Sequence, residues 1–285
     1  RKTAASAAQR PINAFMRAFS RPFVFVGQSA IDFLEMIGGL GLLIMDTARQ
    51  VRRALVAKRG RRLGWANLWA QMDRVGVRSI PIVSLVLFCI GSILALQMAP
   101  ILETFGMVSS VADIISVAVF RELGPLVSAI VLTGFAGASI AAEIGTMVVS
   151  EEIEALHAHA IDPVRFLVVP RVLATTIMMI CITIVGDLAG IIGGMTMSQL
   201  FLGVGFEQYR VRTFAILDLR DFVTGLVKAG VFGLLISSLA CYLGLAVRGG
   251  AQGVGQATTK TVVLTIVALI AVDLMFTAAF YALGW

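Results

Sequence analysis

The feature that most constrains the fold of this chain is a series of apolar runs, each long enough to cross a bilayer. The clearest runs from Ser79 to Leu102 and contains no Asp, Glu, Lys or Arg. A helix needs about 20 apolar residues to cross the hydrocarbon core of a bilayer. Only 14% of the 285 residues are charged, against about 25% in a soluble domain. The sequence therefore predicts an all-α integral membrane protein with no soluble catalytic domain.

Five spans are predicted in all. After the first, they are Met107 to about Met147, Val172 to Phe206, Phe222 to Val247 and Thr261 to Trp285. The second would measure about 60 Å as a straight helix, twice the thickness of a bilayer core. It must therefore break, tilt or project, and Gly124-Pro125 is the natural break because proline removes an amide donor. Glu207 to Asp221 is expected to be a polar loop with a short helix, and Arg248 to Lys260 a glycine-rich loop.

The first 78 residues are predicted to form a basic cytoplasmic or interfacial segment. Residues 1–80 hold 14 of the 23 basic residues and four acidic ones, which favours a cytoplasmic flank facing anionic lipid over a nucleic-acid-binding surface. Within residues 11–48 the best apolar piece, Phe33 to Met45, is too short to span, so we expect an interfacial helix. Trp65 and Trp69, four residues apart, fit an interface anchor. The first twenty residues lack an uninterrupted apolar core, so no cleavable signal peptide is expected there.

This orientation places the loops at 148–171 and 248–260 in the cytoplasm and those at 103–106 and 207–221 outside. The first cytoplasmic loop holds a polar island, Ser150 to Ala160, in which Ser150 can cap a short helix. Ile153, Leu156 and Ala160 form one apolar stripe on that helix. The pattern fits either an ordinary solvated helix or a docking site for a cytoplasmic partner. Asp162-Pro163 is expected to cap and begin the next element.

Charged residues inside the predicted spans need a partner or a wet cavity, because an isolated charge is costly in lipid. Arg121-Glu122 precedes the Gly-Pro break and fits two interpretations equally. It is a polar gate or headgroup contact in a cavity, or it is a structural ion pair or backbone tie at the helix break. Asp187, Lys228 and Asp273 are interpreted as groups that pair between helices, in preference to a proton relay.

Motifs for catalysis by this chain are missing from the sequence. It contains no GxxxxGK[ST], HExxH or GxSxG pattern, so it cannot itself be a standard P-loop ATPase. His157 and His159 lie two residues apart and make a poor metal pair, and the three cysteines form no CxxC pair. We expect no metal and no cofactor to be bound by this chain.

Several ordered motifs resemble one family. They are Arg121-Glu122-Leu123-Gly124-Pro125, Ala142 to Met147 (AEIGTM), Ser150 to Leu156 (SEEIEAL), Asp162-Pro163, Val168 to Arg171 (VVPR), Gln71 to Pro81 (QMDRVGVRSIP) and Gly249 to Thr259 (GGAQGVGQATT). Together they are similar to the MlaE/YrbE permeases, the membrane subunits of MCE-associated lipid ABC transporters. The resemblance covers residue 70 to the C-terminus and identifies residues 79–285 as a permease domain.

The resemblance implies a complex in the inner (cytoplasmic) membrane. Its expected partners are a second permease, identical or paralogous, a cytoplasmic ABC ATPase dimer that binds ATP and Mg²⁺, and extracytoplasmic MCE-domain proteins. Phospholipid is expected in a cavity between the two permeases, and nucleic acid is not an expected partner. Arg121, Glu122, Leu123 and Gln97 are assigned to that lipid cavity. The ATPase contact is assigned to a coupling helix with Glu151, Glu152, Ile153, Glu154 and Leu156.

Three positions depart from the family pattern. Phe135 stands in Gly134-Phe135-Ala136-Gly137 where Gly-Arg-x-Gly is usual, and Glu152 and Glu154 replace the usual Gln and Asp. Two other functions remain open from the residues themselves. One is an ion-coupled secondary transporter that uses Asp187, Lys228 and Asp273, and the other is a membrane scaffold that recruits a cytoplasmic protein through the acidic helix.

Overall fold

The computed structural model describes residue 31 and residues 34–53 and 65–284. Most of these residues are helical, and no strand occurs among them. The predictions for Phe33, for the basic residues at 58–62 and for Trp285 lie outside the described residues, as does much of the predicted interfacial segment at 11–48.

The chain divides into two units, Arg1–Met45 and Asp46–Trp285. In the first unit, the described residues from 34 onward are helical, and Leu34, Ile37 and Leu42 are exposed. Exposed apolar side chains on a short helix agree with an interfacial location, which stays a prediction. The second unit holds all the spans described below.

Five helical segments are long and apolar enough to cross a membrane, which confirms the predicted number. They are Asn67–Thr104, Val108–Val149, Val164–Phe201, Leu219–Leu245 and Gly250–Ala282. The protein is therefore a multi-pass, all-helical membrane protein. The predicted domain boundary at residue 78 stays a prediction.

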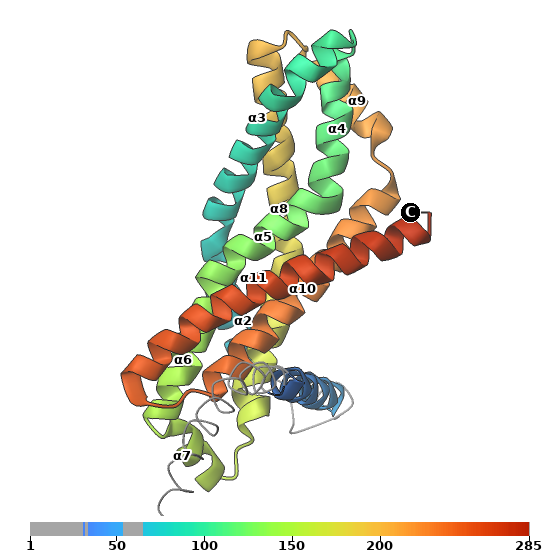
Figure 1. Ribbon diagram of the computed structural model, residues 1–285. Helices are drawn as coiled ribbons and strands as arrows, with labels where there is room; N and C mark the ends of the chain where they lie inside the picture. The colour runs from blue at the N-terminus through green and yellow to red at the C-terminus, as the bar shows by residue number, and fades with distance from the viewer. Residues whose placement is uncertain (1–30, 32–33, 54–64, 285) are drawn as a thin grey trace, which may run out of the picture. The chain divides into compact units, whose positions relative to one another are not determined.

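The helices follow one another with short connections (Figure 1). The elements in chain order are α2 (Trp65–Val75), the 3₁₀ turn η1 (Val77–Ser79), α3 (Ile80–Thr104), the 3₁₀ turn η2 (Val108–Ser110), α4 (Val111–Ala118), the π-turn η3 (Val119–Leu123), α5 (Gly124–Leu132), the π-turn η4 (Thr133–Gly137), α6 (Ala138–Val149), α7 (Glu152–Ala158), the π-turn η5 (Val164–Val168), α8 (Val169–Phe201), α9 (Phe206–Ile216), α10 (Leu219–Leu245) and α11 (Gly250–Ala282). Within the second unit, α7 and α9 lie at opposite ends of the spans (Figure 1).

The core of the second unit is built around α8, which packs against α3 on one side and α10 on another. Glycines allow these helices to touch backbone to backbone. A Cβ added at Gly91 of α3 would lie 1.9 Å from the carbonyl oxygen of Gly190, and one added at Gly193 would lie 2.0 Å from that of Phe88. In lipid, where burial of apolar surface gives little drive for association, such close packing is what holds helices together.

The second span stays helical over its whole length but changes direction. Figure 1 shows the bend between α4 and α5, at the π-turn η3 just before Pro125. Sharp bends in helices occur at prolines and π-bulges, so the predicted break at Gly124-Pro125 takes the form of a bend without a gap. The structure describes a second π-turn, η4, one short helix further on.

The predicted glycine-rich loop at Arg248 to Lys260 is wrong, because α11 begins at Gly250. Two glycines at the start of the segment make the turn, with φ of +89° at Gly249 and +69° at Gly250. Gly253 has another purpose, since a Cβ there would lie 2.0 Å from the carbonyl oxygen of Arg248. Gly249 and Gly250 therefore allow the turn into α11, and Gly253 allows the start of the helix to lie against the backbone of Arg248. The third span also begins earlier than predicted, at Val164 instead of Val172.

We predict that Gly91→Ala lowers the free energy of unfolding by about 2 kcal/mol, because its methyl group would overlap the backbone of α8. Gly255→Ala is the control, since a Cβ added at this helical position meets nothing within 4 Å. Thermal unfolding in detergent, followed by circular dichroism, measures both variants. Equal unfolding temperatures for Gly91→Ala and wild type would contradict the close approach of α3 and α8.

Candidate functional site

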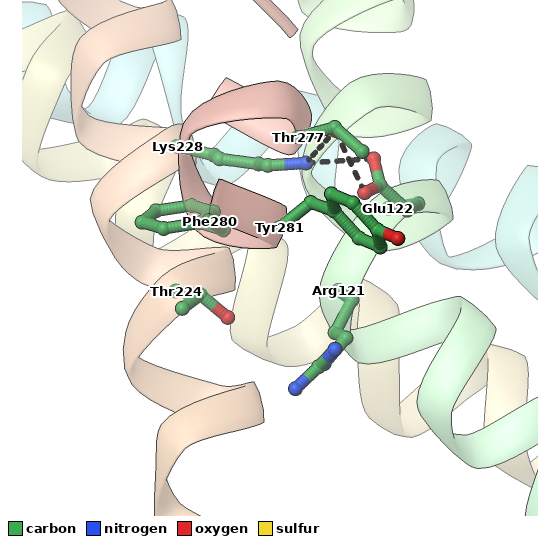
Figure 2. A pocket seen from close by; sticks show the side chains of 7 residues that line it. All are labelled: Arg121, Glu122, Thr224, Lys228, Thr277, Phe280 and Tyr281. Atoms are coloured by element: carbon green, nitrogen blue, oxygen red, sulfur yellow. Dashed lines mark hydrogen bonds and ion pairs between the residues drawn. The ribbon is translucent and has the colours of Figure 1, made fainter. Parts of the chain in front are cut away.

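A pocket of about 130 Å³ lies where the second, fourth and fifth spans meet. Its lining combines charged, hydroxyl and aromatic side chains (Figure 2): Arg121, Glu122, Thr224, Lys228, Thr277, Phe280 and Tyr281. Arg121 and Glu122 come from η3, and the others come from α10 and α11. This is the largest set of charged side chains that the structure brings together inside candidate spans among the described residues.

The π-turn η3 and the proline after it explain how Arg121 and Glu122 are presented. The amide of Gly124 donates to the carbonyl of Val119, five residues back. Pro125 has no amide to offer the next carbonyl, that of Phe120. That carbonyl faces α10, where a Cβ added at Gly225 would lie 2.2 Å from it. The bend thus brings the backbone of η3 against α10, and π-bulges of this kind are frequent at functional sites.

Lys228 is the centre of a network that joins three helices. Its side chain is 1% exposed, and its ammonium group donates to Glu122 Oε2 at 2.7 Å and to Thr277 Oγ1 at 3.0 Å. The Thr277 hydroxyl donates in turn to Glu122 Oε1 at 2.9 Å. Asp273 Oδ1 lies 2.9 Å from the ammonium nitrogen, as an ion pair without the geometry of a hydrogen bond. Figure 2 shows Lys228 directed toward Glu122 and Thr277.

Arg121 pairs with a different carboxylate, at the start of α10. Its Nε donates to Asp221 Oδ1, and the other oxygen of Asp221 accepts the amide of Asp218 at 3.0 Å in a capping box. The guanidinium points away from Glu122 (Figure 2). Its two terminal nitrogens make no hydrogen bond to the described residues, and the side chain is 37% exposed. Arg121 therefore keeps donors free toward the pocket.

The pairing of these residues corrects one part of the structural interpretation of Arg121-Glu122, that of an ion pair between the two. The two side chains do not pair with each other, and each is tied to another helix instead. The group contains two cations, Arg121 and Lys228, and three carboxylates, Glu122, Asp221 and Asp273. A guanidinium with unused donors is a suitable partner for a phosphate oxygen. The geometry thus ties three helices together and leaves donors of Arg121 unused at the pocket.

The acidic helix α7 lies at the other end of the second span and differs in detail from the prediction. Its N-cap is Glu151, in the left-handed conformation with φ of +62°, and Ser150 does not cap it. The Ser150 hydroxyl bonds instead to the carbonyl of Thr146 at 3.0 Å and to Glu152 at 2.9 Å. Ala160 falls beyond the end of the helix, so the predicted apolar stripe is reduced to Ile153 and Leu156.

The side chains of α7 are largely available. Glu151, Glu152 and Glu154 are exposed, while Ile153 and Leu156 are half-buried. The predicted cap at Asp162 is confirmed, since its Oδ1 accepts the amide of Val164 at 2.9 Å. The helix therefore projects an acidic surface beyond α6.

Comparison with known proteins settles the family. The family model described as "Permease MlaE" matches residues 68–279. The chain belongs to the MlaE permease family.

Relatives in this family are similar over most of their length. A probable ABC transporter permease protein of Rickettsia felis is 36% identical over 256 residues, 90% of this chain and 96% of the relative. The intermembrane phospholipid transport system permease protein MlaE of Haemophilus influenzae is 30% identical over 260 residues, 91% and 97% of the two chains. TRIGALACTOSYLDIACYLGLYCEROL 1, a chloroplastic protein of Arabidopsis thaliana, is 30% identical over 220 residues, 77% and 63% of the two chains.

The structure distributes the predicted site residues of this MlaE-family chain unevenly. Arg121, Glu122 and Lys228 line the pocket, and Asp273 pairs with Lys228. Leu123 and Gln97 are not among the described residues that line it, and Gln97 is exposed on α3. Their assignment to a lipid cavity stays a prediction.

Asp187 differs from the expected pairing between helices. It is 1% exposed, and it forms no ion pair with a described residue. Its Oδ1 lies against the backbone of Gly124, where an added Cβ would be 1.6 Å away. Asp187 therefore supports the bend before Pro125 by contact and is not part of the Lys228 network.

Sequence reasoning missed four pocket residues and one ion-pair partner. The residues are Thr224, Thr277, Phe280, Tyr281 and Asp221. One signal was available on α11, where Asp273, Thr277 and Phe280 recur at helical spacing and so share a face. Asp221 carried a signal as well, because Asp218 and Asp221 have the spacing of a capping box.

We predict that Lys228→Met lowers the free energy of unfolding by about 3–5 kcal/mol, because it leaves two carboxylates inside the spans without their cation. Adding Glu122→Gln and Asp273→Asn to Lys228→Met should restore much of the loss. Lys260→Met, which removes an exposed lysine of α11, is the control. Denaturant unfolding in detergent measures the series, and a wild-type transition for Lys228→Met alone would refute the network.

Proposed function

We propose that this chain is the membrane-spanning permease of an ATP-driven phospholipid transporter. In this proposal it binds lipid in a cavity at a permease dimer interface and is driven by a separate cytoplasmic ABC ATPase. The observation that carries the proposal is the Arg121 pocket in a member of the MlaE permease family. The Haemophilus influenzae relative, which this chain matches over nearly its whole length, is named as a phospholipid transport permease.

The pocket has the chemistry that a phospholipid headgroup requires. The free donors of Arg121 suit the phosphate, and charge-assisted hydrogen bonds of this kind are strong. Phe280 and Tyr281 add aromatic surface beside it. Farther along α11, Val263, Val267, Ile270 and Leu274 form an exposed apolar stripe, which suits acyl chains.

The pocket is too small to enclose a phospholipid without help. Its volume is about 130 Å³, whereas pockets that enclose drug-sized ligands measure about 300–1,000 Å³. Only 11% of the most apolar 18-residue stretch of α11 is buried, compared with 61% of the corresponding stretches of the third span, which contains α8, and of α10. A second permease packed against the exposed face of α11 would enlarge the chamber and cover its charged groups. We therefore place the lipid cavity between two permeases.

The acidic helix α7 suits contact with the ATPase. It follows α6 directly, and helical structure is continuous from Val108 through η3 to Val149. A displacement of α7 that passes through the turn at Ser150 and Glu151 would then reach Glu122, and its bonds to α10 and α11, along this helix. We assign the ATPase contact to Glu151, Glu152, Ile153, Glu154 and Leu156. ATP and Mg²⁺ would bind to the partner ATPase.

The proposed complex lies in the inner (cytoplasmic) membrane with its N-terminus and α7 in the cytoplasm. Extracytoplasmic MCE-domain proteins would then sit at the end that carries α9. Under this orientation the basic segment before the first span faces the anionic cytoplasmic leaflet.

We predict that Glu154→Lys and Leu156→Asp reduce lipid-stimulated ATP hydrolysis by the co-purified ATPase at least tenfold. Glu154 is exposed and Leu156 half-buried on α7, so the first variant tests charge and the second tests the apolar contact. Glu207→Lys reverses an exposed acid on α9 and serves as the control. ATP hydrolysis by the reconstituted complex is the measurement.

Two results would overturn this coupling. Lipid transfer that continues without any ATPase and stops when the proton gradient is dissipated would show a secondary transporter. A complex that recruits its cytoplasmic partner through α7 but transfers no lipid would show a scaffold.

We predict that Arg121→Gln lowers phospholipid transfer by about tenfold while leaving the complex assembled, because the pocket loses its free cationic donors. Arg212→Gln is the matched control, since Arg212 pairs with Asp113 at 2.9 Å and has a similar exposed fraction of 39%. Transfer of labelled phospholipid between vesicles measures the effect, and size-exclusion chromatography checks assembly. Equal transfer by both variants would contradict the assignment of Arg121.

A further inference from the structure

A second groove, of about 260 Å³, lies between the start of the first span and the inner part of the second. One wall comes from α2 and η1 and the other from η4 and α6. Its lining residues are Gln71, Arg74, Val75, Arg78, Phe135, Ala136, Ser139, Ile140 and Glu143. It shares no lining residue with the Arg121 pocket.

Arg74 reaches across this groove. Its guanidinium donates to Glu143 Oε2 at 3.0 Å and, more weakly, to the Ser139 hydroxyl at 3.4 Å. The other oxygen of Glu143 pairs with Arg171 at 3.1 Å. Arg171 is 5% exposed, so it approaches Glu143 from the protein interior and its charge is paired there with that carboxylate. Both oxygens of the only carboxylate among the lining residues are thus already in use.

The cations of the groove outnumber its anions. Arg78 is exposed, and its contact with Asp73, at 3.8 Å between two exposed side chains, is weak by ordinary standards. Arg74 keeps donors beyond those used by Glu143 and Ser139, because a guanidinium has five. The groove therefore favours an anion. Among the described residues that line it, no carboxylate has an unpaired oxygen that would attract an ammonium group.

Exposed apolar side chains follow Arg78 along the first span. Arg78, Ile82 and Leu85 have the spacing of one helix face, and the exposed fractions of Ile82 and Leu85 are 46% and 64%. On the opposite wall, Phe135 is 38% exposed. Donors at one end and apolar side chains toward the bilayer centre match the order of groups in a phospholipid that lies along the helix.

We propose that this groove binds an anionic phospholipid of the leaflet on the α7 side, with its phosphate at Arg74 and Arg78 and its acyl chains along Ile82 and Leu85. The site is separate from the transport pocket and does not depend on the proposed function. It gives a purpose to the segment Gln71 to Pro81, which the Arg121 pocket does not use. It also gives one to Phe135, which is 38% exposed and offers apolar surface to the acyl chains.

The test places a fluorescent reporter in the groove. Phe135→Trp is introduced into the full chain after the three native tryptophans, Trp65, Trp69 and Trp285, are replaced by Phe. The protein is reconstituted in phosphatidylcholine nanodiscs that contain brominated phosphatidylglycerol or brominated phosphatidylcholine, and quenching of the indole is recorded against mole fraction. We expect half-maximal quenching by phosphatidylglycerol at a mole fraction about tenfold lower.

Substitutions then locate the recognition. Arg74→Gln with Arg78→Gln should remove the preference for phosphatidylglycerol, since each basic residue near the surface contributes about fivefold to binding of anionic lipid. Arg210→Gln, at an exposed arginine of α9, should leave the preference unchanged. Arg121→Gln should also leave it unchanged, which separates this site from the transport pocket. If the reporter chain does not fold, native mass spectrometry of the unmodified chain and the double variant counts bound phosphatidylglycerol instead.

Three results would overturn the proposal. Equal quenching by the two brominated lipids would show ordinary contact with the bilayer. An unchanged preference in the double variant would place the anion elsewhere. Release of quenching by millimolar inorganic phosphate would show a site for free phosphate and not for lipid. In mass spectrometry, equal numbers of bound phosphatidylglycerol molecules on the double variant and the unmodified chain would likewise place the anion elsewhere.

Discussion

The interaction on which this structure depends is the pairing of Lys228 with two carboxylates inside the candidate spans. A lysine that is 1% exposed among apolar helices is stable as an ion only with partners at hydrogen-bonding distance. Glu122 comes from the second span and Asp273 from the fifth, so one side chain ties three spans together. The pocket lies at this junction, where the charged side chains of the three spans meet.

The network needs the bend in the second span. The π-turn at Val119–Leu123 and Pro125 direct Arg121 and Glu122 toward α10 and α11, and Gly225 lets the backbones meet. Asp187 contributes from α8 by contact with Gly124. The same helical segment ends at Val149, and only the turn at Ser150 and Glu151 separates it from the acidic helix α7. A movement at the α7 end of this helix would act on the bend and on the charged residues that the bend carries, which is a mechanical reason for the two to occur together.

The sequence predicted the helices well and their junctions poorly. Apolar length alone identified five spans, because a continuous apolar run of about 20 residues fits a helix that crosses the bilayer and is about twice the length of a spanning strand. The predicted loop at Arg248 to Lys260 is wrong because glycine composition does not distinguish flexibility from close packing, and Gly253 packs closely against the backbone of Arg248. The cost of burying charge indicated that Lys228 and Asp273 need partners. The partner of Lys228 on the second span, Glu122, is 106 residues away, and this pairing depends on tertiary packing that spacing along one helix does not reveal. Asp187 was expected to pair for the same reason, but it rests against a glycine instead.

Determination of the structure of the purified complex in phospholipid nanodiscs tests the account most directly. The account predicts phospholipid between two permeases, with a phosphate oxygen at hydrogen-bonding distance from the terminal nitrogens of Arg121. It also predicts α7 in contact with the ATPase. A complex in which Arg121 faces only protein and α7 faces only water would contradict it.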